Sequence, residues 1–145
     1  MEREIKFRAK DVNTEMWVYG DLVHNQKVTK EGLEPRVMVG GYEVYKDTIC
    51  QFTGLKDAKG VDIYGGDILR FPPKNDYEFK TYCGFEVFWH DNDCCDSHIG
   101  WQMNRLHFYG NICGYGGWEK FIPKWTSKMI IIGNIFDNKE LLKGE

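Results

Sequence analysis

The feature that most constrains this fold is a strict alternation of apolar and cationic side chains over residues 5–10. The two sets are Ile5, Phe7 and Ala9 against Lys6, Arg8 and Lys10. A period of two puts successive side chains on opposite faces of a β-strand, so the segment predicts a strand with one apolar and one cationic face. Residues 11–15 are turn-like and residues 16–23 are β-prone, which predicts a hairpin. Gly20 lies inside the returning strand and indicates a bulge or a close backbone approach.

A second hairpin is predicted over residues 50–64. Its β-prone segments, 50–55 and 61–64, flank a turn in which Gly60 can take the left-handed conformation. Shorter β-prone segments follow, and we expect strands at 68–71, 84–90, 99–103, 120–122 and 128–132. The predicted fold class is therefore all-β and mainly antiparallel.

Two other segments are interpreted differently. The stretch 25–35 is polar and is expected to be a loop. Asp137 precedes Glu140 by three residues, as in a capping box, so a short C-terminal helical turn is expected over 137–142.

The length and composition favour one domain over residues 1–145, because domains cluster at about 100–150 residues. Residues 72–128 are where a variable subdomain would lie. The longest purely apolar runs, such as 129–132, are far below the ~20 residues that span a bilayer, so no membrane helix is expected. The N-terminus has no apolar signal segment, and five cysteines without an export signal favour reduced thiols. We expect a cytoplasmic protein.

Cations share one strand face near the N-terminus and interleave with aromatic rings near the C-terminus, although the net charge is −3 and gives no general attraction to phosphate. Such interleaving suits stacking on single-stranded bases. The candidate binding residues are Lys120, Lys124, Trp125 and Trp118 near the C-terminus, and Lys6 and Arg8 near the N-terminus. The alternative is that most tryptophans lie in the core.

Glycine followed by Asp or Asn and an apolar residue recurs at 20–22, 66–68, 110–112 and 133–135. Both residue types tolerate the backbone angles of a turn that leads into a strand, so the pattern favours turn chemistry. Asp67 could be read as a catalytic carboxylate, but hydrogen bonding to backbone amides explains it more simply.

Three blocks of the chain resemble the YopX family, small proteins encoded by bacterial phages and prophages. They are residues 3–9 with Trp17-Val18-Tyr19-Gly20-Asp21, residues 51–57 with Ile63-Tyr64-Gly65-Gly66-Asp67-Ile68, and Ile132-Gly133-Asn134-Ile135-Phe136-Asp137-Asn138 with Glu140-Leu141-Leu142. Gly65 and Lys139 depart from the family pattern, and residues 72–128 do not align. The resemblance implies a largely β fold with a small SH3-like barrel, a host-cell cytoplasm and no known reaction. Its motif residues, expected to be structural, are Gly54, Tyr64, Gly66, Asp67, Gly133 and Asn134.

Residues 90–98 contain the densest cluster of potential metal ligands. Only His90 and Cys94 have the spacing of a zinc ligand pair, and the adjacent Cys94 and Cys95 do not come off one tight turn, so we predict no metal site. A Cys–His nucleophilic pair is the enzymatic alternative, but no nucleophile elbow or phosphate-binding loop supports it. We expect neither cofactor nor catalysis.

The function predicted from these features is a non-catalytic protein-interaction or self-assembling module. Its partner would be a host or phage protein, or a second copy of the chain, and no membrane is involved. The alternative is a nucleic-acid-binding β-barrel protein acting in phage regulation or replication. The sequence does not identify the partner.

Overall fold

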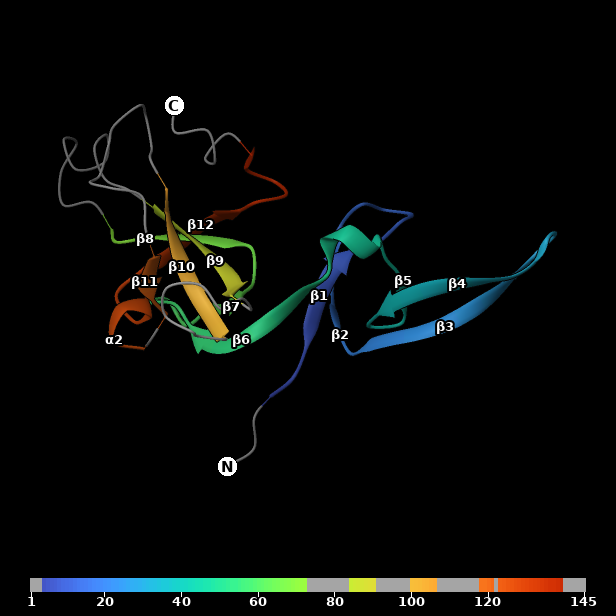
Figure 1. Cartoon of the computed structure of the whole chain (residues 1–145), viewed down its shortest axis with the longest axis horizontal. Helices are drawn as coiled ribbons and strands as arrows, with labels where there is room; N and C mark the ends of the chain where they lie inside the picture. The colour runs from blue at the N-terminus through green and yellow to red at the C-terminus, as the bar shows by residue number, and fades with distance from the viewer. Residues whose placement is uncertain (1–3, 73–83, 91–99, 107–117, 122, 140–145) are drawn as a thin grey trace. The chain divides into compact units, whose positions relative to one another are not determined.

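The computed structural model describes residues 4–72, 84–90, 100–106, 118–121 and 123–139 (Figure 1). Its strands form three sheets, ordered β2-β1-β6-β7, β11-β10-β9-β8-β12 and β3-β4-β5. The predicted all-β, mainly antiparallel fold class is confirmed, whereas the SH3-like barrel is not confirmed. The chain divides into two compact units, Met1–Gly54 and Leu55–Glu145, and each is described by itself.

The first unit begins with the predicted hairpin. β1 (Phe7–Lys10) pairs antiparallel with β2 (Trp17–Gly20), and β6 (Cys50–Lys56) pairs with the other edge of β1. The apolar side of β1 packs into a core in which Ala9 is fully buried. Ile5, the first residue of the alternation, precedes the strand and is exposed.

The close backbone approach expected at Gly20 is confirmed. A Cβ built on Gly20 would lie 2.8 Å from the Gly40 Cα, and a Cβ on Gly40 would meet the Tyr19 carbonyl oxygen. Gly40 also has a φ of 61°, which glycine adopts without strain. Neither position can therefore accept a side chain unless the backbone moves.

The predicted loop over residues 25–35 is wrong. β3 (Leu22–Thr29) and β4 (Gly32–Val39) form a long antiparallel hairpin there, with Thr29 opposite Gly32. The sequence lacks apolar alternation because no side chain of β3 is buried, and in β4 only Val37 and Val39 are. Backbone pairing, which is independent of side-chain polarity, keeps the two strands together.

A short strand and a helical turn complete the first unit. β5 (Tyr42–Glu43) pairs with the end of β4, and the 3₁₀ helix η1 (Lys46–Thr48) leads into β6. The Thr48 hydroxyl oxygen accepts the Lys10 N–H at 2.9 Å and the hydroxyl donates to the Tyr45 carbonyl at 2.7 Å. These bonds fix η1 against β1.

The other predicted hairpin consists of β6, whose last two residues begin the second unit, and β7 (Asp62–Tyr64). Gly60 closes the turn with a φ of 81°, and its N–H donates to the Asp57 carbonyl at 3.0 Å. The left-handed turn glycine predicted from the sequence is therefore confirmed.

The five-stranded sheet of the second unit consists of β11 (Trp118–Lys120), β10 (Gly100–Leu106), β9 (Gly84–His90), β8 (Asp67–Arg70) and β12 (Ile130–Asn134), in that order. One of its faces packs on the core, whose buried members are Ile63, Leu69, Phe85, Val87, Met103 and Met129. β9 has the predicted bounds.

Two strand predictions near the C-terminus are displaced. β11 ends at Lys120, two residues before the predicted end, and the short helix α2 (Pro123–Thr126) follows closely. Its turns continue to Met129, whose N–H donates to the Thr126 carbonyl at 3.1 Å, and this delays β12 by two residues. The C-terminal helical turn stays a prediction, since residues 140–142 lie outside the described residues. Within the described part of the chain, no helix has the length and apolarity needed to cross a bilayer.

Candidate protein-interaction surface

The predicted binding cations Lys6, just before β1, and Arg8, on β1, lie against aromatic rings of their own unit. Lys6 Nζ is 4.7 Å from the Phe52 ring centroid and forms an ion pair with Glu4 at 2.6 Å. The Arg8 guanidinium lies 4.6 Å from the Trp17 ring centroid, and Arg8 is only 6% exposed. Cation–π packing of this kind stabilises the strand face by itself. A binding role for Lys6 and Arg8 stays a prediction.

The other predicted binding group belongs to the second unit. Lys124 Nζ lies 5.3 Å from the Trp125 ring centroid, and Trp125 meets Phe71 edge-on with centroids 6.2 Å apart. Trp125 also packs against the core of this unit. Trp118 and Lys120 lie on β11, and their side chains are outside the described part of the structure. The role of these four residues in binding stays a prediction.

The potential metal ligands of residues 90–98 cannot be placed. His90 ends β9, with its side chain not described, and residues 91–98 lie outside the described residues. Within the described ranges, no three His, Cys, Asp or Glu side chains gather into a metal-binding group.

The second motif block forms a tightly bonded turn. Asp67 is buried, and its Oδ2 accepts the Tyr64 N–H at 2.8 Å. Gly66 has a φ of 90°, donates its N–H to the Val87 carbonyl at 2.8 Å and accepts the Ile135 N–H at 2.9 Å. Gly54 has a φ of 93° within β6. These contacts position the backbone of the turn.

The third motif block is organised by Asn134. Its Oδ1 accepts the N–H groups of Phe136 at 2.9 Å and Asp137 at 2.8 Å, while its own N–H donates to Asn138 Oδ1 at 3.1 Å. The Asn138 carboxamide lies against Gly133, where an added Cβ would be 2.6 Å from Asn138 Cγ. Gly133 and Asn134 therefore define the turn that follows β12.

Asp57 has an equally central position, and the sequence analysis did not single it out. Its buried carboxylate accepts the N–H groups of Lys59 at 2.8 Å, Val61 at 2.9 Å and Ile131 at 3.1 Å. It thereby joins the β6–β7 turn to β12. Its place at the start of a glycine-closed turn was the available signal for its turn bonds. The bond from Ile131 could not be predicted in this way, because Ile131 is 74 residues from Asp57 in the sequence.

Burial raises the pKa of the Glu86 carboxyl above its ordinary value. Glu86 lies on β9 opposite Ile68 of β8 and Asn104 of β10. Across these described registers, neither neighbour is a second carboxyl or an imidazole that would form an acid–base pair with it.

The hairpin of β3 and β4, called the ribbon below, extends beyond the core of the first unit. Figure 1 shows the ribbon extending away from β1, β2 and β5. Val28 is 83% exposed and Leu33, directly opposite it near the tip, is 63% exposed. Isolated two-stranded hairpins are marginally stable in water, so a long ribbon with an apolar tip is typical of a segment that meets a partner.

Side chains of the ribbon divide between two faces because the period is two. The core-side face is continuous with the buried Val37 and Val39 and comprises Leu22, His24, Gln26, Val28, Leu33, Pro35, Val37 and Val39. The polar face comprises Val23, Asn25, Lys27, Thr29, Gly32, Glu34, Arg36 and Met38.

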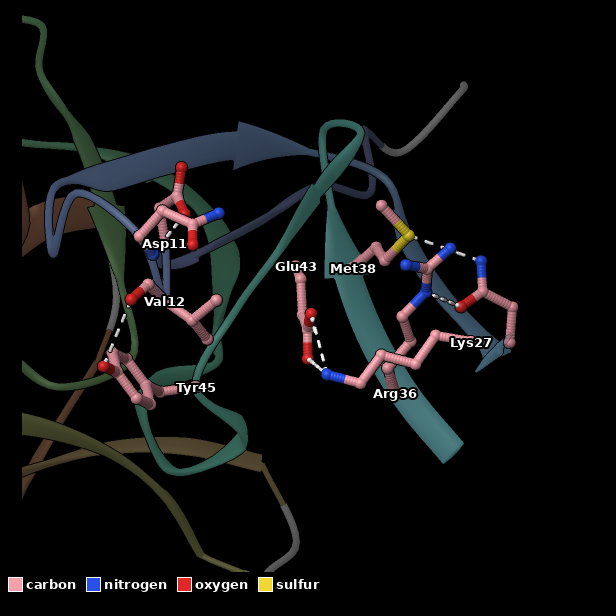
Figure 2. A network of polar contacts seen from close by, with 9 residues as sticks. Asp11, Val12, Lys27, Arg36, Met38, Glu43 and Tyr45 are labelled. Carbon is pink, nitrogen blue, oxygen red and sulfur yellow. Dashed lines mark hydrogen bonds and ion pairs between the residues drawn. The ribbon is translucent and has the colours of Figure 1, made fainter. Parts of the chain in front are cut away.

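Several side chains of the polar face bond to one another and to β5 (Figure 2). Lys27 Nζ lies 3.1 Å from Glu43 Oε2, and Arg36 Nε donates to Asn25 Oδ1 at 2.7 Å. Asn25 Nδ2 reaches the Met38 sulfur at 3.3 Å. These bonds tie both strands and β5 together on one side and stiffen the ribbon without covering its core-side face.

The loop that joins β1 to β2 anchors β5 and Tyr45, next to the base of the ribbon, where β5 pairs with the end of β4 (Figure 2). Asp11 Oδ1 accepts the Asn13 N–H at 2.8 Å, and the Tyr45 hydroxyl donates to the Val12 carbonyl at 3.3 Å. The Val12 N–H donates in turn to the Glu43 carbonyl at 3.0 Å. The anchored base and the exposed tip make the ribbon the best candidate for a functional surface.

Comparison with known proteins supports the fold and the family. The crystal structure of protein EF1440 from Enterococcus faecalis is similar, with a TM-score of 0.52 and 22% identity over 97% of this chain and 99% of that chain. A likeness at that identity concerns the fold alone, and no curated protein matches. The family model described as YopX protein matches residues 6–143, which confirms the resemblance of the three sequence blocks. The chain belongs to the YopX family.

Proposed function

We propose that this chain is a non-catalytic protein-interaction module encoded by a bacterial phage or prophage, and that it acts in the host cytoplasm. Binding occurs through the core-side face of the ribbon. The observation that supports this most directly is the exposure of Val28 and Leu33, a cross-strand apolar pair near the tip of the hairpin.

The energetics favour a bound state of the tip. Covering an aliphatic side chain stabilises a complex by about 1.5–3 kcal/mol, so the Val28–Leu33 pair can contribute several kcal/mol as an upper bound. The anchored base and the polar network keep the two strands ordered before binding. A preordered ribbon loses less conformational entropy when it meets a partner.

The proposal of binding without catalysis is supported by the backbone contacts of two buried carboxylates, of which Asp67 resembles a catalytic group. Asp67 accepts a backbone N–H of its own turn, and Asp57 accepts three. A carboxylate engaged in this way stabilises a turn, which accounts for both residues without a reaction.

The test is affinity capture from bacterial extract by tagged wild type and by a variant with Val28→Lys and Leu33→Lys. The matched control is Val61→Lys, which alters an exposed valine in the second unit. We expect a specific protein, or an untagged copy of this chain, to be retained by wild type and control, and reduced at least about tenfold by the tip variant. Equal recovery by all three proteins would contradict the proposal.

Nucleic-acid binding is the second candidate, favoured by one observation. On the cationic face of the hairpin β1–β2, the exposed Tyr19 lies opposite Arg8, and Lys10 Nζ lies 5.3 Å from the Trp17 ring centroid. The test is titration with single-stranded oligonucleotides at low salt, where phosphate-driven binding is strongest. This candidate predicts measurable affinity that Tyr19→Ala weakens, and no binding at low salt would remove it.

A further inference from the structure

The outer edge of β3 is unpaired along its length in the described part of the chain. In the sheet β3-β4-β5, β4 lies on one side of β3, and among the described residues no strand pairs with the other side. An edge strand offers unpaired N–H and C=O groups to another chain unless proline, a bulge or charges obstruct it. β3 contains no proline, and Lys27, its cation, is ion-paired with Glu43.

The register identifies the backbone groups that point to this edge. In an antiparallel pair, alternate residues bond to the partner, and the residues between them point their N–H and C=O groups outward. The Asp21 carbonyl accepts the Gly40 N–H at 3.1 Å, so odd-numbered residues of β3 bond to β4. The outward residues of β3 are therefore Leu22, His24, Gln26 and Val28.

The opposite edge of the ribbon is closed by Pro35. Val37 directs its carbonyl away from β3, since that group accepts the Val44 N–H at 3.1 Å. Pro35 is two residues earlier and points its nitrogen the same way, where it has no hydrogen to donate. Of the two edges of the ribbon, that of β3 is the one suited to pairing.

We propose that a second copy of this chain pairs antiparallel with the β3 edge, so that two β3-β4-β5 sheets form one continuous six-stranded sheet about a two-fold axis at Asn25. This deepens the proposed function, on which it rests, by naming the partner. The register sets Leu22 opposite the partner's Val28, Val23 opposite the partner's Lys27, His24 opposite the partner's Gln26, and Asn25 opposite the partner's Asn25.

Side-chain complementarity selects this register. It joins outward residues to outward residues, as hydrogen bonding requires. It also places Val28, the most exposed apolar residue at the tip, beside the half-buried Leu22 at the partner's base. On the core-side face, Leu33 and Val28 then continue into the partner's Leu22 and the partner's Val39, and two-fold symmetry repeats this apolar row at the other end of the sheet.

Neighbouring registers are less favourable. A slide of two residues sets Gln26 against the partner's Gln26 and moves Val28 onto the partner's His24. A slide of four sets Lys27 against the partner's Lys27, a like-charge pair that opposes association. In the proposed register no two charged side chains of the same sign are opposite each other. The paired edge is short, so we expect reversible association with a dissociation constant on the order of 1–100 µM.

The first test is sedimentation velocity over a concentration series with wild type, Gln26→Pro and Gln26→Ala. Proline at 26 removes an outward N–H without breaking a bond to β4, and Pro35 directly across the ribbon is already tolerated. Alanine keeps the N–H. We expect the dissociation constant to rise at least about tenfold for Gln26→Pro and to stay within about threefold of wild type for Gln26→Ala.

The second test determines the register by oxidation of Asn25→Cys and Lys27→Cys. Residues opposite each other in a non-hydrogen-bonded pair have Cα atoms about 4.5 Å apart, which a disulfide spans. Residue 25 meets its own copy in that way, whereas residues 27 of the two copies would be about 13 Å apart. We expect a covalent dimer from Asn25→Cys, located by mass spectrometry of the disulfide-linked peptide, and little from Lys27→Cys.

Each outcome decides the proposal. Concentration-dependent dimers that Gln26→Pro dissociates, with the cross-link at residue 25, support it. A monomer at all concentrations, a dimer that survives Gln26→Pro, or no cross-link at residue 25 overturns it. A monomer that still retains a bacterial protein through Val28 and Leu33 would overturn self-pairing and leave the proposed function standing, whereas loss of both would remove both.

Discussion

Replacing Asp57 by alanine should destabilise the second unit more than most single substitutions. The buried carboxylate accepts three backbone N–H groups, two within the β6–β7 turn and one from Ile131 of β12. The Lys59 and Val61 N–H groups belong to exposed residues, where water can partly replace the carboxylate. The Ile131 N–H is less exposed and lies at the start of the β12 pairing with β8.

The magnitude follows from these three bonds. Each of the two turn bonds contributes about 0.5–1.5 kcal/mol net, and an unsatisfied donor at Ile131 costs about 1–3 kcal/mol. The expected loss for Asp57→Ala is therefore about 2–6 kcal/mol. Asp57→Asn keeps one oxygen for the turn but sets its amide N–H against the Ile131 N–H, so we expect a smaller loss of about 1–3 kcal/mol.

Urea unfolding followed by tryptophan fluorescence measures both changes, and hydrogen exchange of the Ile131 amide locates them. Asp47→Ala is the matched control, because Asp47 is exposed in η1 and should change the stability by no more than about 0.5 kcal/mol. If Asp57→Ala unfolds within about 1 kcal/mol of wild type, or leaves the exchange of the Ile131 amide unchanged, the reasoning is refuted.

Three further predictions concern other contacts of the second unit. Gly133→Ala should destabilise this unit by about 1–3 kcal/mol because the added methyl group meets Asn138. In the double variant with Asn138→Ala, most of that loss should disappear. A double-mutant cycle by chemical denaturation measures this coupling, and additive effects of the two substitutions would contradict it. Burial raises the pKa of Glu86, so in the folded protein this carboxyl holds its proton to a higher pH than in the unfolded chain, and its contribution to stability falls as pH rises above the ordinary value of 4.5. Glu86→Gln should therefore gain stability relative to wild type across that rise, and a pH-independent difference in urea midpoint would argue against this. Trp125→Ala should cost about 3–5 kcal/mol because the ring packs on Phe71 and the core, whereas Lys124→Ala should change the urea midpoint little; equal small effects would show that Trp125 is not a core residue.

Sequence patterns predicted those parts of the fold in which local chemistry and burial agree. The alternation before Lys10 and the glycine-closed turn at Gly60 both become hairpins, because a period of two and a left-handed glycine are local requirements. The three motif blocks predicted the family for a similar reason. Their residues, such as Asn134, bond to backbone only a few positions away.

The ribbon was not predicted because most of its side chains are exposed, so its sequence does not alternate between apolar and polar residues. His24, Asn25 and Gln26 are exposed on a strand that pairs only with β4 in the described structure. The sequence of this segment therefore lacks the apolar–polar alternation that predicts a strand. The two-residue connection at Lys30 and Glu31 was the available signal, but it lacks the Asn-Gly type of turn sequence. The hydrogen bond from the Ile131 N–H to Asp57 was not predicted either, since sequence patterns do not predict contacts between distant segments.

The central claim, that the β3 edge pairs with a second copy, is tested most directly by amide hydrogen exchange of residues 22–29 as a function of protein concentration. The N–H groups of His24, Gln26 and Val28 point away from β4, whereas those of Asn25 and Lys27 bond to it. The account predicts that the first three exchange more slowly as concentration rises, while the other two change little. Exchange rates of His24, Gln26 and Val28 that do not depend on concentration would contradict it.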